Sequence, residues 1–188
     1  EIAEVGVDPL RAGFVHLVDK DVSGLMVVAK IARAFESLKR QFQDRTTYKE
    51  YIALVYGVLS KDHDVIEMKI ARSKARGRMV ARPVSQEGKE AKTEYEVIER
   101  LKNLTLVKVI LHTGRTHQIR VHLRAMNYPI VGDKLYKKSH MKNIRPIELD
   151  RIFLHSYKLR IRLMDGTEKT FVEPLPNELQ LILKRLSV

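Results

Sequence analysis

The chain has 188 residues, of which 44% are hydrophobic and 31% charged, an ordinary balance for a soluble globular protein. The sequence contains no apolar run of about 18 residues, so it predicts no membrane-spanning helix. Its first residues have neither the basic end nor the apolar block of a signal peptide. The lack of cysteine excludes disulfides and thiolate metal sites and is typical of a cytoplasmic protein.

The 35 Lys and Arg residues outnumber the 23 Asp and Glu residues, which gives a formal net charge of +12. Such a charge favours polyanionic partners, because cations that neutralise phosphates release counterions. Two segments each hold five basic residues and no acidic one. They contain Arg72, Lys74, Arg76, Arg78 and Arg82, and Lys134, Lys137, Lys138, Lys142 and Arg145, respectively. We therefore expect a nucleic acid as partner, with solvated loops as the alternative.

The first part of the chain predicts two short strands, a helix and a longer strand. Residues 14–18 and 25–29 are β-prone runs separated by the turn-like KDVSG. Residues 31–44 place apolar side chains on one helical face and basic ones elsewhere, which predicts a helix lying on a sheet. Residues 48–59 predict a strand that ends at the polar SKDHD.

The middle of the chain predicts a hairpin followed by a helix. Residues 92–101 and 104–111 are β-prone and are joined by a plausible turn at residues 102–103. Thr116 is expected to cap a helix that runs to Ala125.

The last part of the chain predicts a second hairpin and a closing helix. Residues 157–163 alternate apolar and basic side chains, as in a half-solvated strand, and Asp165-Gly166 is a turn signal. Residues 176–186 form an amphipathic pattern. Because long strands are joined by a few separated helices and no repeat or linker occurs, we expect a single α+β domain over residues 1–188.

Asp19 is a first candidate for chemistry, because it follows an apolar run and precedes a Ser-Gly turn. A carboxylate at the end of a core strand is costly to desolvate unless a cation meets it. An aspartate that only caps the turn is the ordinary alternative.

Arg120 and Arg124 are four residues apart beside the apolar Ile119 and Leu123, so they share a helical face. An arginine at the edge of a buried face is suited to a bidentate pair with a carboxylate. Arginines that only snorkel along the helix edge are the alternative.

Other motifs are uninformative or absent. The spacing of His112, His117 and His122 differs from that of HExxH, so we expect no metal site. No phosphate-binding loop, dinucleotide fingerprint or GxSxG elbow occurs. Tyr51, in an otherwise apolar strand, is either a core aromatic residue or a ring that stacks on a base.

Four segments, in order, resemble the signatures of RluA-type pseudouridine synthases, and together they cover nearly the whole chain. They are VHLVDKDVSGLMVVAK (15–30), KEYIALVYG (49–57), LHTGRTHQIRVHLRAMNYPIVGDKLY (111–136) and LHSYKLRI (154–161). The resemblance implies the family's α+β fold, a mixed, largely antiparallel twisted sheet with flanking helices. It also implies isomerisation of uridine in RNA to pseudouridine, without cofactor or metal.

The resemblance further implies roles for single residues. Asp19 matches the essential aspartate, which acts on the ribose either by attacking C1′ or by abstracting a proton to give a glycal. Arg120 matches the arginine that pairs with this aspartate, and Tyr51 the tyrosine that stacks on uracil. Ile119 is expected to pack near the base.

The target uridine must be flipped out of a folded RNA, whose backbone is gripped by cationic loops. The resemblance to a mobile hairpin of related enzymes implies that the segment 72–82 clasps the RNA. The expected phosphate contacts are Arg72, Lys74, Arg76, Arg78, Arg115 and Lys134.

Two substitutions and one gap separate the chain from the family pattern. Leu17 stands where the family has an arginine associated with base flipping, and Val22 replaces a threonine. Leucine can wedge into a stack but cannot hold a phosphate or a base edge. The family's preceding strand region is also missing, so we expect a catalytic domain without that N-terminal segment.

These observations predict a cytoplasmic, monomeric RNA pseudouridine synthase that acts on ribosomal or transfer RNA. One alternative is a catalytically impaired RNA-binding paralogue or RNA chaperone, which Leu17 and Val22 would fit. Another is a basic structural protein of a ribonucleoprotein.

Overall fold

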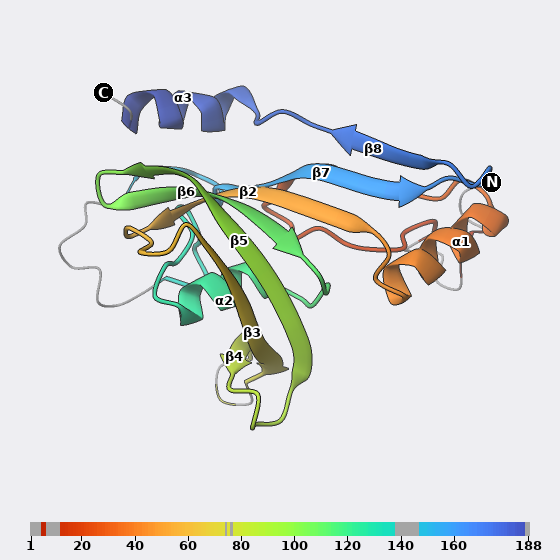
Figure 1. The fold of residues 1–188 in the computed structure, drawn as a ribbon, viewed down its shortest axis with the longest axis horizontal. Helices are drawn as coiled ribbons and strands as arrows, with labels where there is room; N and C mark the ends of the chain where they lie inside the picture. The colour runs from red at the N-terminus through yellow and green to blue at the C-terminus, as the bar shows by residue number, and fades with distance from the viewer. Residues whose placement is uncertain (1–4, 7–11, 74, 76, 138–146, 187–188) are drawn as a thin grey trace.

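A single twisted sheet organises the computed structural model, which describes residues 5–6, 12–73, 75, 77–137 and 147–186 (Figure 1). The strand order is β1-β7-β2-β6-β5-β3-β4, and β8 also pairs with β7. The contact between β1 and β7 is parallel, and the other neighbours are antiparallel. The expected mixed, largely antiparallel α+β fold is therefore confirmed.

The strands are β1 (Ser23–Gly24), β2 (Tyr48–Tyr56), β3 (His63–Arg72), β4 (Met79–Arg82), β5 (Lys89–Leu101), β6 (Leu104–Leu111), β7 (Leu154–Arg162) and β8 (Glu168–Val172). The helices are α1 (Ala32–Gln43), α2 (Gln118–Ala125) and α3 (Asn177–Leu186). Within the described residues, none of these helices is long and apolar enough to cross a bilayer.

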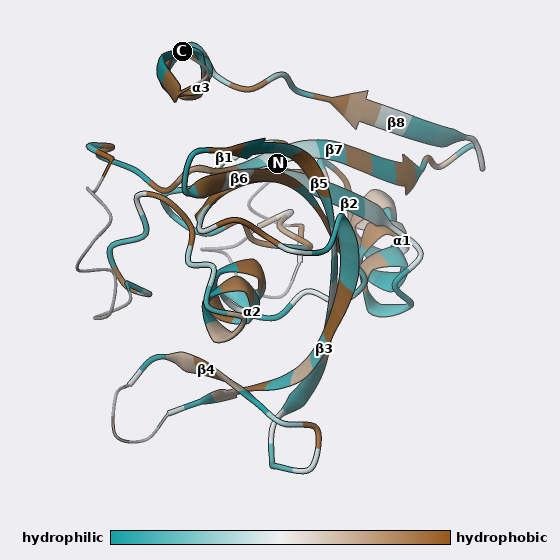
Figure 2. Ribbon diagram, turned by 60° about the vertical axis from the view of Figure 1, so that its left-hand side comes forward, coloured by the Kyte–Doolittle hydropathy of each residue, from teal (hydrophilic) through white to brown (hydrophobic). Residues whose placement is uncertain are grey.

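The core is built around β2, which pairs with β6 on one side and β7 on the other. Its central residues Ala53, Leu54 and Val55 are fully buried, as expected for a strand in the middle of a sheet. Figures 1 and 2 show α2 in the concavity of the curved sheet and α3 on its other side. Helix α1 packs near β7 and contributes to a second, smaller apolar cluster.

The strands predicted at 14–18 and 25–29 are wrong. Only one isolated bridge, between Phe14 and Val28, joins them, and the regular strand of this region is the two-residue β1. The imidazole of His16 takes the place of a strand partner, because its Nε2 accepts the Val27 N–H at 3.1 Å. The segment before Asp19 is therefore held by a side chain and not by a ladder.

The predicted Thr116 cap is also wrong. Helix α2 starts at Gln118, its N-cap is His117 in the left-handed region (φ 56°), and no side chain caps it. The side chain of Gln118 fixes the helix start instead. Its Oε1 accepts the backbone N–H of Arg115, and its Nε2 donates to Lys92 O and Thr93 Oγ1. This amide ties the start of α2 to β5.

Strands β3 and β4 were not predicted as strands. Their hairpin carries the segment 72–82 at its tip, with Arg72 at the end of β3 and Arg82 at the end of β4. Charged residues obscure the alternation of Ile66, Met68 and Ile70, which was the available signal for β3. The segment was thus correctly expected to be a hairpin from the resemblance, but not from its own pattern.

Candidate functional site

A cleft of about 810 Å³ lies where the segment before β1, the middle of β2 and the start of α2 meet. Its lining includes Asp19, Tyr51, Ile119 and Arg120, four residues that the sequence had singled out. Part of the cleft lining comes from two irregular stretches, the 14–22 segment and the 113–117 loop. Binding and catalytic side chains are often carried by such loops on a rigid scaffold.

Asp19 and Arg120 meet in this cleft, although 101 residues separate them. Arg120 Nη1 donates to Asp19 Oδ2 at 3.1 Å, and the side chains are 12% and 23% exposed, respectively. A partly desolvated pair of this kind keeps a carboxylate ionised and oriented. The second oxygen, Oδ1, faces His117 Nε2 at 3.9 Å, beyond hydrogen-bond distance.

Asp133 holds the other edge of the Arg120 guanidinium. Arg120 Nε donates to Asp133 Oδ2 at 2.8 Å and Nη2 donates to Oδ1 at 3.0 Å, a bidentate arrangement. The Asp133 carboxylate also accepts the N–H groups of Leu135 and Tyr136, each at 2.9 Å. Burial alone would raise the pKa of this carboxyl, but the hydrogen bonds with Arg120 and the amides lower it.

Tyr51 lies on β2 with its side chain almost entirely inside, 8% exposed. Burial raises the pKa of its phenol, against a hydrogen bond with Ser156, and the charge of Asp19 raises the pKa further. The phenol is therefore protonated at neutral pH. Its position on the cleft lining is compatible with both meanings offered by the sequence, a core aromatic residue and a ring next to the base.

His117 and Tyr136 complete the surroundings of the ion pair. His117 Nδ1 and the Tyr136 hydroxyl are 2.7 Å apart, and the Tyr136 ring lies under the Arg120 guanidinium at 4.9 Å. Burial lowers the pKa of His117, while the negative charge of Asp19 opposes this shift. The Tyr136 ring, itself in contact with His117, thus packs against the guanidinium that pairs with Asp19.

Two apolar side chains also face the cleft. Ile119 is buried, 4% exposed, and lines the cleft beside Arg120. Leu17, at the position of the family's arginine, is 63% exposed and lines the same cleft. An exposed leucine here contributes apolar surface at the mouth and no charge.

The structure brings one of the expected phosphate contacts, Arg115, to the cleft lining, with its Nε donating to Glu90 O. Arg72 donates to Gly77 O within the hairpin, and Lys134 is exposed beside Asp133. Arg78 donates to Leu135 O at 2.6 Å and lies 5.8 Å from the Tyr136 ring, so it contacts the protein itself. Lys74 and Arg76 lie outside the described residues.

The three histidines of the 112–122 segment point to different partners. His112 contacts Glu94 at 2.7 Å, and His117 contacts Tyr136. His122 is buried between Thr93 Oγ1 and Met68 O, and burial lowers its pKa to about 4. Within the described ranges, no group of three or more potential ligands is arranged to hold a metal ion.

The sequence interpretation had left Asp133, Tyr136 and the contacts of His117 without a role. Asp133 carried the same signal as Asp19, because its carboxylate follows the apolar residues Ile130 and Val131 and Gly132 at the end of a buried stretch. No local pattern pointed to Tyr136, since its importance comes from stacking between elements distant in the sequence.

Comparison with known proteins decides the family. Residues 6–125 match the model of the RNA pseudouridylate synthase family, a range that includes Asp19, Tyr51 and Arg120. The chain belongs to this family. Ribosomal large subunit pseudouridine synthase D of Nitrosomonas europaea is 39% identical over 94% of the chain and 52% of its own length. Ribosomal large subunit pseudouridine synthase D of Zymomonas mobilis is 37% identical over 95% of the chain and 57% of its own length.

A solved family structure agrees with the fold. Human RNA Pseudouridylate Synthase Domain Containing 1 has a TM-score of 0.75 and 28% identity, covering 93% of this chain and 80% of its own. The resemblance to pseudouridine synthases inferred from sequence motifs is thus confirmed. The chain spans about half the length of the curated relatives it matches.

Proposed function

We propose that the protein isomerises uridine to pseudouridine in structured RNA. The observation that carries this proposal is the ion pair between Asp19 and Arg120, held by Asp133 in a cleft that Tyr51 also lines. The reaction breaks the bond from C1′ to N1 of the uracil and forms one from C1′ to C5, and the proton leaves C5 while N1 regains one. No atom is gained or lost, so the reaction consumes no oxidant, reductant or co-substrate.

Asp19 is proposed to act on the ribose through Oδ1, because Oδ2 accepts the hydrogen bond from Arg120. Attack of Oδ1 on C1′ and removal of a ribose proton by the same oxygen both require an ionised carboxylate. Arg120 keeps it ionised, and Asp133 fixes the angle at which Arg120 meets it. Tyr51 is proposed to stack on the uracil and Ile119 to border it.

Ribosomal RNA is the favoured substrate, since several relatives are named as ribosomal large subunit pseudouridine synthases. Transfer RNA remains the second substrate class. We further propose that residues 1–188 act as one catalytic domain and as a monomer. We also propose that the protein acts in the cytoplasm, a location with which the lack of cysteine agrees. Arg72, Lys134 and Arg115 are proposed to contact phosphates, together with Lys74 and Arg76.

The decisive test substitutes Asp19→Asn and compares it with Asp21→Asn, an aspartate of the same turn. Unmodified ribosomal and transfer RNA transcripts are incubated with each protein, and pseudouridine is quantified by mass spectrometry of the nucleosides. We expect Asp19→Asn to lower the rate of pseudouridine formation at least about a thousandfold while RNA binding persists. Asp21→Asn should keep both the rate and the RNA binding. Turnover by the Asp19→Asn protein would refute the assignment, and RNA binding without turnover by the unsubstituted protein would favour an RNA chaperone.

A further inference from the structure

Lys49 is a buried cation on the cleft side of β2. Its side chain is 8% exposed, and it lines the cleft two residues before Tyr51. Tyr48 and Glu50 lie on the other face of the strand, where the Tyr48 hydroxyl donates to the Glu50 carboxylate at 2.6 Å. Two residues along a strand span about 6.6 Å, so Lys49 stands next to the ring that we assign to the base.

In the part of the chain that the structure describes, the groups that contact the ammonium of Lys49 are neutral. Its Nζ donates to Thr47 Oγ1 at 3.3 Å and lies 5.6 Å from the centre of the Phe42 ring. Among the described residues, no carboxylate comes within ion-pair distance of it. Burial, reinforced by the positive charge of Arg45, lowers the pKa of Lys49. A buried ammonium without an anion is costly, and an anion bound beside it would remove this cost.

His16 lies next to Lys49 and is a neutral neighbour of its ammonium. Its ring stacks on Phe42 at 4.5 Å, and its Nε2 accepts the Val27 N–H. Burial, together with the charge of Lys49, lowers the pKa of His16 to about 4, so the ring is neutral at pH 7. Because Nε2 is an acceptor, the single proton of the neutral ring is on Nδ1.

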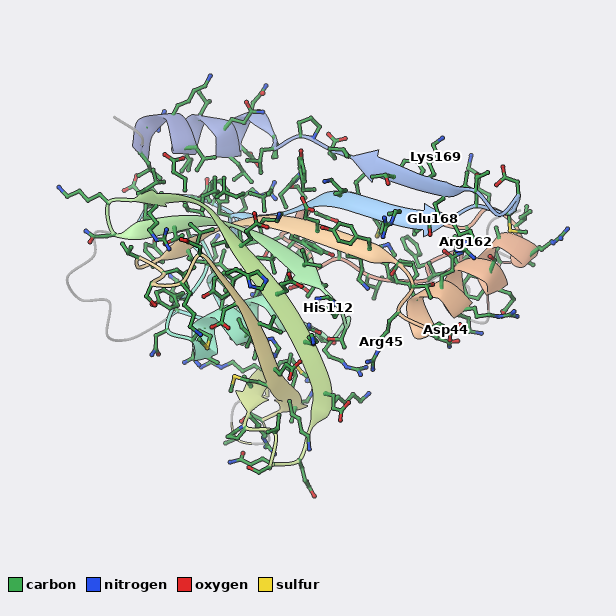
Figure 3. The ribbon with its side chains drawn as sticks, in the orientation of Figure 1. Asp44, Arg45, His112, Arg162, Glu168 and Lys169 are labelled. Atoms are coloured by element: carbon green, nitrogen blue, oxygen red, sulfur yellow. The ribbon has the colours of Figure 1, made fainter. Side chains whose placement is uncertain are left out.

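The cleft as a whole has an excess of positive charge. Its lining holds one carboxylate, Asp19, against Lys20, Lys39, Arg45, Lys49, Arg115 and Arg120. Arg120 is already paired with Asp19 and Asp133. Arg45 is exposed, and Figure 3 shows its side chain at the turn that follows α1. Lys49 is thus the buried and Arg45 the exposed one of two lining cations whose positive charges act on each other.

We propose that Lys49 and Arg45 form a phosphate subsite, which holds a phosphodiester of the RNA next to the uridine on Tyr51. This inference rests on the proposed function, because it assumes that the base occupies the cleft. A phosphodiester supplies the negative charge that Lys49 lacks, and its non-bridging oxygens accept hydrogen bonds from both side chains. The subsite would fix the ribose between the phosphate and Asp19, and so orient C1′ toward Oδ1.

The test uses three probes: uridine, uridine 3′-monophosphate and uridine 5′-monophosphate. Each is titrated into the full chain, and binding is followed by NMR chemical shifts. We expect one monophosphate to bind at least about tenfold more tightly than uridine, as a desolvated charge-assisted contact would give. Lys49→Met should remove this difference, and Arg45→Gln, at an exposed position, should reduce it.

Lys158→Met is the matched control, because Lys158 lies beside Glu50 on the opposite face of the sheet. It makes the same charge change and should keep the preference for the monophosphate. Equal binding of uridine and both monophosphates to the unsubstituted protein would overturn the proposal. A preference that survives in Lys49→Met would overturn it too.

Folding of the Lys49→Met protein is checked by its melting temperature. Methionine replaces the buried ammonium by an apolar chain and leaves no carboxylate unpaired, so we expect the melting temperature to stay equal or to rise. A lower melting temperature with unchanged nucleotide binding would make Lys49 a structural charge. Since these titrations need no turnover, a protein that binds the monophosphate but forms no pseudouridine would refute the proposed function alone.

Discussion

Asp133 takes two nitrogens of the Arg120 guanidinium and leaves the third for Asp19. The side chain of Asp133 is 1% exposed, so its charge is almost completely removed from water. The ion pair with Asp19 consequently depends on a second carboxylate that does not face the substrate. Asp133 is a positioning residue for the proposed reaction.

Replacing Asp133 should affect both stability and catalysis. Asp133→Asn removes the negative charge and places an amide N–H group, a donor, against the donor nitrogens of Arg120. We therefore expect the free energy of unfolding to fall by about 3 kcal/mol. The rate of pseudouridine formation should fall at least about a hundredfold, because Arg120 is free to turn away from Asp19. Urea denaturation and single-turnover kinetics measure the two effects. Glu178→Gln, in an exposed pair with Arg151, is the control and should cost less than about 1 kcal/mol.

Leu17 permits a test of RNA engagement. Because this side chain is exposed at the cleft, Leu17→Arg should leave stability nearly unchanged and strengthen RNA binding. The slope of log affinity against log salt concentration should steepen by about 0.7 to 0.9, corresponding to one additional phosphate contact. Leu181→Arg, on the exposed side of α3, should leave the slope as it is. An unchanged slope in Leu17→Arg would mean that this position faces no phosphate.

At the level of elements, the β3–β4 hairpin contacts the site through the packing of Met79 and Ala81 against the cluster that contains Tyr136, and through Arg78. Arg78 donates to Leu135 O and lies over the Tyr136 ring, which also contacts the Arg120 guanidinium. The same loop carries Asp133, so the hairpin and the ion pair share a contact. RNA that displaces the hairpin would thereby disturb the orientation of Arg120.

Arg78→Met should loosen this connection. We expect faster hydrogen exchange at the β4 amides of Val80 and Ala81 and a severalfold lower turnover rate, while the salt dependence of RNA binding changes little. Arg82→Met, whose guanidinium donates to Glu87 O, serves as control and should leave turnover unaffected. A loss of one phosphate contact in Arg78→Met with normal turnover would instead make Arg78 an RNA ligand.

At the scale of the whole molecule, the buried neutral His122 links folding to pH. Burial holds its pKa at about 4, below the ordinary 6.5 of an unfolded chain, so the unfolded state binds more protons between these values. The contribution of neutral His122 to the free energy of unfolding is therefore fully present above about pH 6.5 and is lost as the pH falls toward 4. The decline due to His122 is at most about 3 kcal/mol.

Urea denaturation from pH 7.5 to 4 measures this dependence. His122→Gln, which keeps polar atoms near Thr93 and Met68 but does not titrate, should show a flatter decline than the unsubstituted protein. His63→Gln, at an exposed histidine on β3, is the control and should leave the slope nearly unchanged. An equal slope in the His122→Gln protein would contradict a role for this residue in acid unfolding.

Much of the fold and part of the site could be predicted from the sequence. Strand β2, the hairpin of β5 and β6 and helix α2 follow from hydrophobic period and turn residues, which are local properties. Asp19 and Arg120 were singled out because charge beside apolar runs is costly, and family motifs joined them. Strand β3 escaped because charged side chains on its exposed face mask the alternation beneath.

The sequence by itself determined the α+β class and the family, and it supplied the residues that we propose for the chemistry, because periodicity, charge and motifs are properties of neighbouring residues. Tertiary structure alone decided how they combine. It placed Asp133 against Arg120, Tyr136 beside two guanidinium groups, and Lys49 in the cleft with no carboxylate of the described residues to pair with it. These are long-range contacts between partly or fully buried charges, whose energy depends on burial and distance in three dimensions and so leaves no local pattern.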